Sequence, residues 1–276
     1  MYKLKQAIAD NDILSASLWL AYRFSIGEKL DVAHYQALLT EWAECATQAK
    51  VIGHSTQPDE AAFGRLLNFF YVDLAFSGDE KHYFSCQYSL INQVMDYRTG
   101  IPVSLAIIFQ SLAKQLGFEV KGVNFPGHFL LCYQVNANRS LYIDPLNGKF
   151  LSPCELEQLY FSILSEIDDE KMPPEALAPA GCDETVMRLL HNLKASYINE
   201  KAFDKALLAV ELLVELSPDD PYERRDRGFL LHQLDCTQVA IADYQYFIRR
   251  CPKDPANQLL EAQIRQLVDH PPVVLH

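Results

Sequence analysis

The feature that most restricts the fold of this chain is a repeat with a spacing of 34 residues near its C-terminus. The pairs that carry the repeat are Ala206 and Ala240, Pro218 and Pro252, and Pro221 and Pro255. A period of this length is typical of stacked helix–turn–helix units, each of which buries its apolar face against the next. Small alanines let the two helices of one unit approach closely, and prolines end helices. The C-terminal region is therefore expected to be entirely α-helical.

Both copies match the packing pattern of the tetratricopeptide repeat. The matching positions are Leu193, Tyr197, Ala206, Val210, Leu213 and Pro218 in the first copy, and Gly228, Leu231, Ala240, Tyr244, Phe247 and Pro252 in the second. Residues 256–269 have apolar side chains at helical spacing and are predicted to form a capping helix. We expect residues 183–276 to bind a protein or peptide partner, with packing against the rest of the chain as the alternative.

The region before the repeats changes from purely helical to mixed. Residues 1–76 have apolar side chains spaced three and four apart, which predicts several amphipathic helices. Residues 101–116 are apolar nearly all round, so this helix is expected at the centre of its domain. Residues 118–124, 128–135 and 141–144 have the character of strands separated by turns. A central helix followed by a small antiparallel sheet makes the expected fold class α+β.

An acidic segment with three prolines separates the two regions. It covers residues 165–182, and its prolines are unfavourable in a continuous helix or a central strand. We therefore expect three parts: a domain over residues 1–164, a linker over 165–182 and a repeat domain over 183–276.

Charge and cysteine content narrow the range of functions. The chain has 24 Lys and Arg against 36 Asp and Glu, a net charge of −12, which disfavours binding to nucleic acids or anionic membranes. Its seven cysteines are scattered without metal-ligand spacing, and neither a P-loop nor a GxGxxG phrase is present, so we expect no metal and no cofactor. The sequence shows neither a long apolar stretch nor a leader-like N-terminus, which favours a cytoplasmic protein.

One His and one Asp suggest where chemistry could occur. His128 begins one predicted strand and Asp144 ends the next, 16 residues later, so an antiparallel hairpin would place them side by side. A helix followed by strands that carry a His and an Asp is the layout of papain-like and transglutaminase-like thiol enzymes. In that layout the helix N-terminus activates a nucleophile, the His accepts its proton and the Asp orients the imidazole.

Three phrases of this sequence resemble the SirB-type family. They are ArgThrGlyIleProValSerLeu at 98–105, GlyValAsnPheProGlyHisPhe at 122–129 and IleAspProLeuAsnGly at 143–148. The resemblance covers most of the chain. It implies a bacterial transglutaminase-like domain with a papain-like core, preceded by a helical region and followed by tetratricopeptide repeats. The name of the family refers to the regulation of virulence-gene expression, which implies a regulatory role.

The same resemblance indicates that the usual nucleophile is missing. In active transglutaminase-like domains a cysteine opens the central helix, and alignment on Leu116 and Gly117 places that cysteine at Pro102. Proline has no group that can attack a carbonyl. We therefore expect a pseudoenzyme that acts in protein–protein interaction or regulation.

An enzyme remains the alternative hypothesis. Ser104 could be a displaced nucleophile for a hydrolase or acyltransferase that uses Ser104, His128 and Asp144, although a serine in the first turn of a helix usually caps it. Cys132 and Cys86 are the other candidate nucleophiles, and burial as small apolar side chains is the simpler interpretation of both. Without a nucleophile, His128 and Asp144 have two open interpretations: a structural pair in a chain that serves as a scaffold, or part of a ligand pocket that includes Arg98, Pro102 and Asn124.

Overall fold

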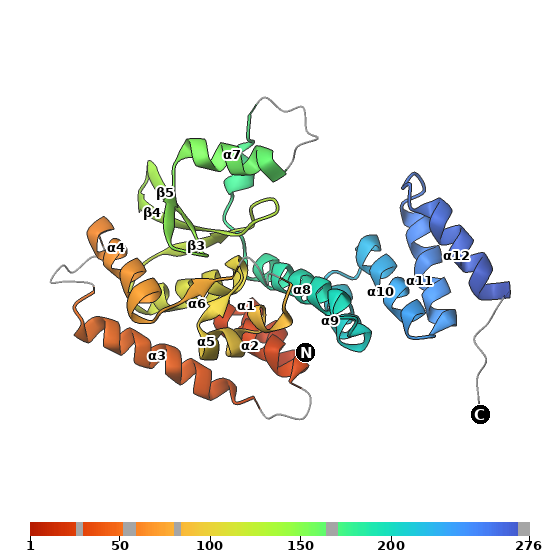
Figure 1. The fold of residues 1–276 in the computed structure, drawn as a ribbon, viewed down its shortest axis with the longest axis horizontal. Helices are drawn as coiled ribbons and strands as arrows, with labels where there is room; N and C mark the ends of the chain where they lie inside the picture. The colour runs from red at the N-terminus through yellow and green to blue at the C-terminus, as the bar shows by residue number, and fades with distance from the viewer. Residues whose placement is uncertain (26–29, 52–58, 80–83, 164–170, 270–276) are drawn as a thin grey trace. The chain divides into compact units, whose positions relative to one another are not determined.

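The computed structural model describes residues 1–25, 30–51, 59–79, 84–163 and 171–269 of the chain. Two compact units make up the chain, unit 1 (Met1–Leu189) and unit 2 (Leu190–His276). Figure 1 shows helices throughout the chain and strands in the first part only. The α+β fold with an all-α C-terminal region is confirmed.

Unit 1 begins with helices and continues with a small sheet. Its helices are α1 (Tyr2–Ala9), α2 (Ile13–Phe24), α3 (Val32–Gln48), α4 (Glu60–Asn68), α5 (Ile91–Tyr97), α6 (Pro102–Gln115) and α7 (Pro153–Ile163). A π-helical turn, η1 (Phe69–Asp73), and two 3₁₀ turns, η2 (Cys86–Tyr88) and η3 (Pro174–Leu177), lie between them. The strands are β1 (Ser77–Gly78), β2 (Thr99–Gly100), β3 (Val120–Val123), β4 (Leu130–Asn136), β5 (Arg139–Asp144) and β6 (Lys149–Leu151).

Helix α6 forms the core of unit 1, as its composition predicts. Ten of the first eleven side chains of α6 are buried on all sides of the helix, and the other helices and the sheet cover them. An aromatic cluster continues this core, with the rings of Phe70 and Phe109 5.2 Å apart and those of Phe63 and Tyr133 stacked at 4.1 Å. Because burial of such rings dominates core energetics, this helix holds the unit together.

The main sheet is antiparallel, with the strand order β3-β4-β5-β6. Side chains of β4 alternate between the two faces: Leu130 and Cys132 pack with Leu156 and Tyr160 of α7, and Tyr133 packs with Phe63 of α4. Figure 1 shows α7 and α6 on opposite faces of this sheet. The short strand β6 was not predicted, because its three residues carry too little of the alternating pattern.

The described part of the expected linker packs against unit 1. Residues 165–170 lie outside the described residues. After them, Met172, Ala176 and Leu177 pack against the cluster under α7, and Pro179 forms an antiparallel bridge with Val123. These contacts with β3 and α7 place residues 171–181 in unit 1, whereas the domain boundaries given above stay a prediction.

Unit 2 contains the predicted repeats. Its helices are α8 (Cys182–Asn199), which begins in unit 1, then α9 (Phe203–Leu216), α10 (Pro221–Gln233), α11 (Thr237–Arg250) and α12 (Asn257–Asp269). The matching positions Leu193, Tyr197, Ala206, Ala240 and Tyr244 are at most 1% exposed. Of the helices that the structure describes, none combines the length and apolar character needed to cross a membrane.

Candidate functional site

The start of α6 carries Pro102, the residue that the family resemblance predicts at the position of the nucleophile. Ile101 is the N-cap, and Pro102 is the first residue of the helix, where its fixed φ and missing N–H are tolerated. Both side chains are buried. Pro102 offers no proton donor or nucleophile at this position.

Ser104 stabilises this helix start. Its buried hydroxyl donates to the carbonyl oxygen of Tyr88 at 2.7 Å and accepts from the N–H of Ile101 at 3.0 Å. A Cβ on Gly100 would lie only 2.6 Å from Ser104 Oγ, so only glycine fits there without displacing the hydroxyl. Ser104 therefore connects η2 to the first turn of α6.

The structure brings His128 and Asp144 together. Gly127, with φ of 63°, completes the turn before His128, and Asp144 ends β5. The imidazole Nε2 lies 3.2 Å from Asp144 Oδ1, and the two side chains are 15% and 21% exposed. Within the described parts of the chain, Asp144 is the one hydrogen-bond partner of this ring.

The carboxylate of Asp144 is held in its charged form. Burial opposes its ionisation, but hydrogen bonds from His128 and from the N–H of Leu146 outweigh burial and lower the pKa of Asp144 below its ordinary value. Beside it, Tyr71 donates a hydrogen bond of 2.8 Å to the carbonyl oxygen of Pro145, and burial raises the pKa of Tyr71 above its ordinary value. The hydrogen bond of the partly buried Tyr71 thus fixes the turn after Asp144.

The other predicted pocket residues make different contacts. The guanidinium of Arg98 lies 4.1 Å over the ring of Trp42 and 5.0 Å from the ring of Phe76. The side-chain oxygen of Asn124 accepts a hydrogen bond of 3.1 Å from Arg188. Among residues with described positions, no hydrogen bond connects Arg98, Pro102 or Asn124 to His128 or Asp144.

The two candidate cysteines differ in environment. Cys132 is buried beneath α7, and burial raises its pKa, so its thiol is a poor source of thiolate. Cys86 lies in η2, and Tyr88 of the same turn accepts the hydrogen bond from Ser104. The roles of Tyr71 and Tyr88 were not predicted from sequence. Tyr71 acts through a hydrogen bond to a backbone carbonyl that is distant in sequence, and Tyr88 acts through its own backbone carbonyl, so neither contact leaves a pattern in the sequence.

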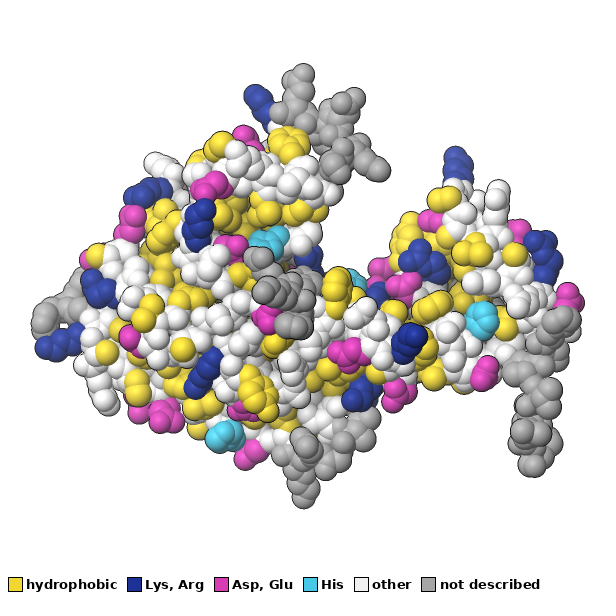
Figure 2. Space-filling view, viewed as in Figure 1, with side chains coloured by type: hydrophobic (Ala, Val, Ile, Leu, Met, Phe, Trp, Pro, Cys, Tyr) yellow, Lys and Arg dark blue, Asp and Glu magenta, His cyan; other side chains and the backbone are white. Residues whose placement is uncertain are grey.

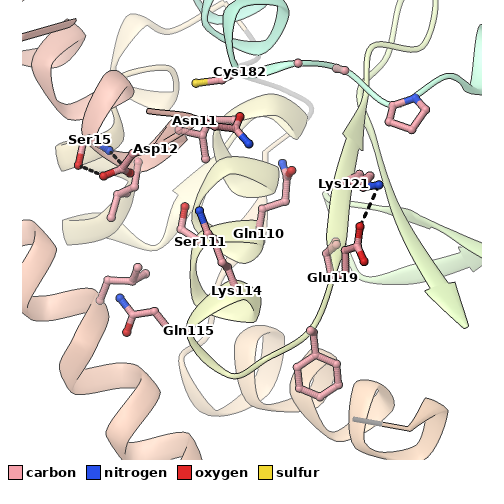
Figure 3. A pocket seen from close by; sticks show the side chains of 18 of the residues that line it. Asn11, Asp12, Ser15, Gln110, Ser111, Lys114, Gln115, Glu119, Lys121 and Cys182 are labelled. Carbon is pink, nitrogen blue, oxygen red and sulfur yellow. Dashed lines mark hydrogen bonds and ion pairs between the residues drawn. The ribbon is translucent and has the colours of Figure 1, made fainter. Parts of the chain in front are cut away.

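A separate cavity of about 950 Å³ lies elsewhere in unit 1. Figure 3 shows its polar side chains coming from the turn before α2, from α6, from the segment that leads into β3 and from the start of α8. None of its lining residues is His128, Asp144 or Ser104.

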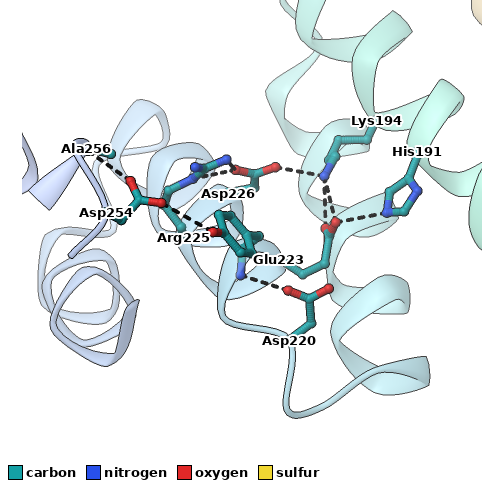
Figure 4. Close-up of polar contacts among 9 residues, drawn as sticks. His191, Lys194, Asp220, Glu223, Arg225, Asp226, Asp254 and Ala256 are labelled. Atoms are coloured by element: carbon teal, nitrogen blue, oxygen red, sulfur yellow. Dashed lines mark hydrogen bonds and ion pairs between the residues drawn. The ribbon is translucent and has the colours of Figure 1, made fainter. Parts of the chain in front are cut away.

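Unit 2 has a buried carboxylate within an ion-pair network. Glu223 of α10 is bonded to His191 Nε2 at 2.9 Å and to Lys194 Nζ at 2.9 Å, and Lys194 also reaches Asp226 at 2.8 Å. Figure 4 shows these side chains projecting toward one another from α8 and α10. Burial opposes ionisation of Glu223, but the hydrogen bond from His191 and the charge of Lys194 hold its pKa below the ordinary value.

Comparisons with known proteins agree with this architecture. A family profile described as the transglutaminase-like superfamily matches residues 33–191, and a tetratricopeptide repeat profile matches residues 193–265. No solved structure matches the chain significantly.

Three curated relatives cover most of this chain. A UPF0162 protein of Vibrio cholerae is 37% identical over 86% of this chain and 87% of its own length. The UPF0162 protein YchA of Escherichia coli K12 is 33% identical over 79% and 80%, respectively. Protein SirB1 of Salmonella typhimurium is 32% identical over 77% of this chain and 78% of its own length.

Proposed function

Since this chain belongs to the transglutaminase-like family that includes SirB1 and the UPF0162 proteins, we propose that it is a non-catalytic member that regulates a cytoplasmic process by binding a protein partner. The observation that carries the proposal is the start of α6. There, Pro102 stands at the position that the family resemblance assigns to the nucleophile, and the hydroxyl of Ser104 is hydrogen bonded to backbone groups.

Ser104 is badly suited to attack a substrate. A general base must lie within hydrogen-bond reach of the proton that it removes. The hydroxyl proton of Ser104 instead points to a backbone carbonyl, and the imidazole of His128 bonds to Asp144. Activation would require Ser104 to give up its hydrogen bonds with Tyr88 and with the N–H of Ile101 in a fully buried position, which costs free energy.

The pair of His128 and Asp144 fits a structural role in this proposal. Its hydrogen bond joins the turn before β4 to the end of β5, and the same Asp144 oxygen accepts the N–H of Leu146. The pair therefore closes one end of the hairpin with a charge-assisted contact.

An exposed face of α10 supports partner binding by unit 2. Tyr222 and Phe229 are seven residues apart, on one side of the helix, and remain 47% and 37% exposed. Arg225 lies between them, with its guanidinium 5.3 Å from the ring of Tyr222. Aromatic residues and arginine are enriched among the side chains that dominate binding energy at protein interfaces.

The test is quantitative capture of partners by the full chain from the cytosolic fraction. We expect the wild type to capture a specific protein, and the double variant Tyr222→Ser, Phe229→Ser to capture at least tenfold less of it. The matched control is Val239→Ser, because Val239 is a 50% exposed apolar side chain on α11, and it should retain that protein. Equal capture by the double variant and the wild type would contradict the proposal.

The hydrogen bond between His128 and Asp144 keeps one enzymatic alternative testable. If the chain were a hydrolase or acyltransferase, a fluorophosphonate or iodoacetamide probe would label the wild type, and His128→Ala would abolish the labelling. We expect no fluorophosphonate labelling of Ser104 and no effect of His128→Ala on iodoacetamide labelling of any cysteine. Labelling of Ser104 that depends on His128 would establish the enzyme.

A further inference from the structure

The cavity of unit 1 has a strand edge as one of its walls. Strand β3 is at the end of the four-stranded sheet, so only one of its sides pairs with β4. Residues Gly117–Lys121, which lead into β3 and form its first half, line the cavity. Edge strands with unpaired backbone groups are places where another extended chain can add.

The chain itself pairs with the other half of this edge. The N–H of Ala180 donates to the carbonyl oxygen of Gly122 at 2.8 Å, and Pro179 forms an antiparallel bridge with Val123. The added segment then ends, because α8 begins at Cys182. The outer edge of β3 is thus paired at Gly122, whereas the residues before Gly122 line the cavity.

Val120 exposes the next pairing position. Backbone groups in an antiparallel strand alternate between its two sides, so the outward carbonyl of Gly122 implies that the N–H and C=O of Val120 also point outward. Among the residues whose positions are described, none forms a backbone hydrogen bond with Val120 on that side. Val120 is one of the residues that line the cavity, which gives a ligand in the cavity access to this edge.

The remaining walls supply polar groups and one available positive charge. Lys121 is paired with Glu119 at 2.9 Å, and the carboxylate of Asp12 accepts the N–H and the hydroxyl of Ser15 as the N-cap of α2, where the helix dipole offsets its charge. Lys114 has no ion-pair partner within the described residues, and it lines the cavity together with Gln110 and Asn11 (Figure 3). Side-chain amides can hydrogen bond to peptide groups, and a lysine favours a carboxylate.

From these observations we infer that the cavity binds an extended acidic peptide of a partner protein. The backbone of the peptide pairs with Val120, over about three residues given the length of the free edge. An Asp or Glu side chain of the peptide bonds to Lys114. This site goes beyond the proposed function, since it uses unit 1 alone and does not depend on the exposed face of α10.

Arrays of immobilised hexapeptides test the inference with the full chain. One array carries a single Asp or Glu flanked by Val, Ile and Thr, and the second replaces that residue by Asn or Gln. We expect wild-type binding to peptides of the acidic array to be at least tenfold tighter than to their neutral counterparts. No binding to any acidic peptide, or equal binding to both arrays, would overturn the inference.

Two substitutions and one modified peptide then examine the mode of binding. Val120→Pro removes the outward N–H and should weaken binding about tenfold. An edge strand tolerates proline, and Val120→Thr, which keeps the N–H, should bind as the wild type does. Lys114→Gln removes the positive charge and should weaken binding about tenfold, whereas Lys253→Gln, at an exposed lysine of unit 2, should not. N-methylation of alternate peptide amides should abolish binding.

The controls separate this site from the face of α10. If N-methylation or Val120→Pro leaves affinity unchanged, pairing at the β3 edge is wrong. The variant Tyr222→Ser, Phe229→Ser should bind the acidic peptides as the wild type does, and loss of binding in that variant would place the peptide site in unit 2 instead.

Discussion

At the residue scale, Ser104 caps α6, and removing its hydroxyl should destabilise the chain. Ser104→Ala removes the hydroxyl that bonds to both Ile101 and Tyr88, and the N–H of Ile101 keeps only its longer bond of 3.3 Å to the carbonyl oxygen of Tyr88, so the expected cost is about 0.5–1.5 kcal/mol. Urea denaturation followed by circular dichroism measures the loss. Ser162→Ala is the control, because Ser162 is exposed, and equal stability of the two variants would contradict the capping role.

Asp144 should make stability depend on pH in the acidic range. The pKa of Asp144 is lower in the folded chain than the ordinary value of 3.8. The charged carboxylate therefore stabilises the fold fully above that pH, and this stabilisation is lost as the pH falls through the folded pKa. Asp144→Asn should cost about 1 kcal/mol at pH 7, and the difference from the wild type should shrink below about pH 4. Unfolding free energies at pH 7 and pH 3 measure this. A constant difference would show that the charge of Asp144 does not contribute.

The contact between His128 and Asp144 could be predicted from sequence, whereas the surroundings of Arg98 and Asn124 could not. His128 lies two residues before β4, and the pairing of Leu131 with Ile143 brings the end of β5 close to the turn that carries His128, so a hairpin predicted from the strand pattern was enough to place the two residues near each other. Arg98 instead lies over Trp42, which is distant in sequence, and Asn124 bonds to Arg188 of α8. Contacts of this kind depend on how separate elements pack.

At the scale of elements, the network between α8 and α10 should stabilise unit 2. Lys194→Met would leave Glu223 buried with weaker compensation, which should cost about 2–3 kcal/mol. The double variant Lys194→Met, Glu223→Met should recover part of that loss, because it removes both buried charges. Lys253→Met is the exposed control. A double variant less stable than Lys194→Met would contradict this account.

Long periodic elements could be predicted from sequence more completely than short ones. The all-round apolar pattern predicted the buried helix α6, and the 34-residue spacing predicted the helices of unit 2. Strand β6 and the two-residue strands β1 and β2 are too short to carry a period. Residues 171–181 pack on β3 and α7 although their prolines suggested a linker, because proline also suits the edge of a sheet.

At the scale of the whole molecule, net charge governs which polymers the chain can approach. On the face seen in Figure 2, basic side chains are scattered, and acidic ones lie among them. With a net charge of −12, the chain should not bind a 20-base-pair duplex at about 50 mM salt, as measured by fluorescence anisotropy. A submicromolar dissociation constant there would contradict the expectation.

Both tryptophans of the chain, Trp19 and Trp42, lie in unit 1, and each has a cation 4.1 Å over its ring, from Lys3 and Arg98, respectively. Indole emission is therefore an optical signal of the first unit alone. Unfolding of the repeats by themselves would leave indole emission unchanged while ellipticity falls. Fluorescence and circular dichroism recorded on one sample can therefore follow the unfolding of each unit separately.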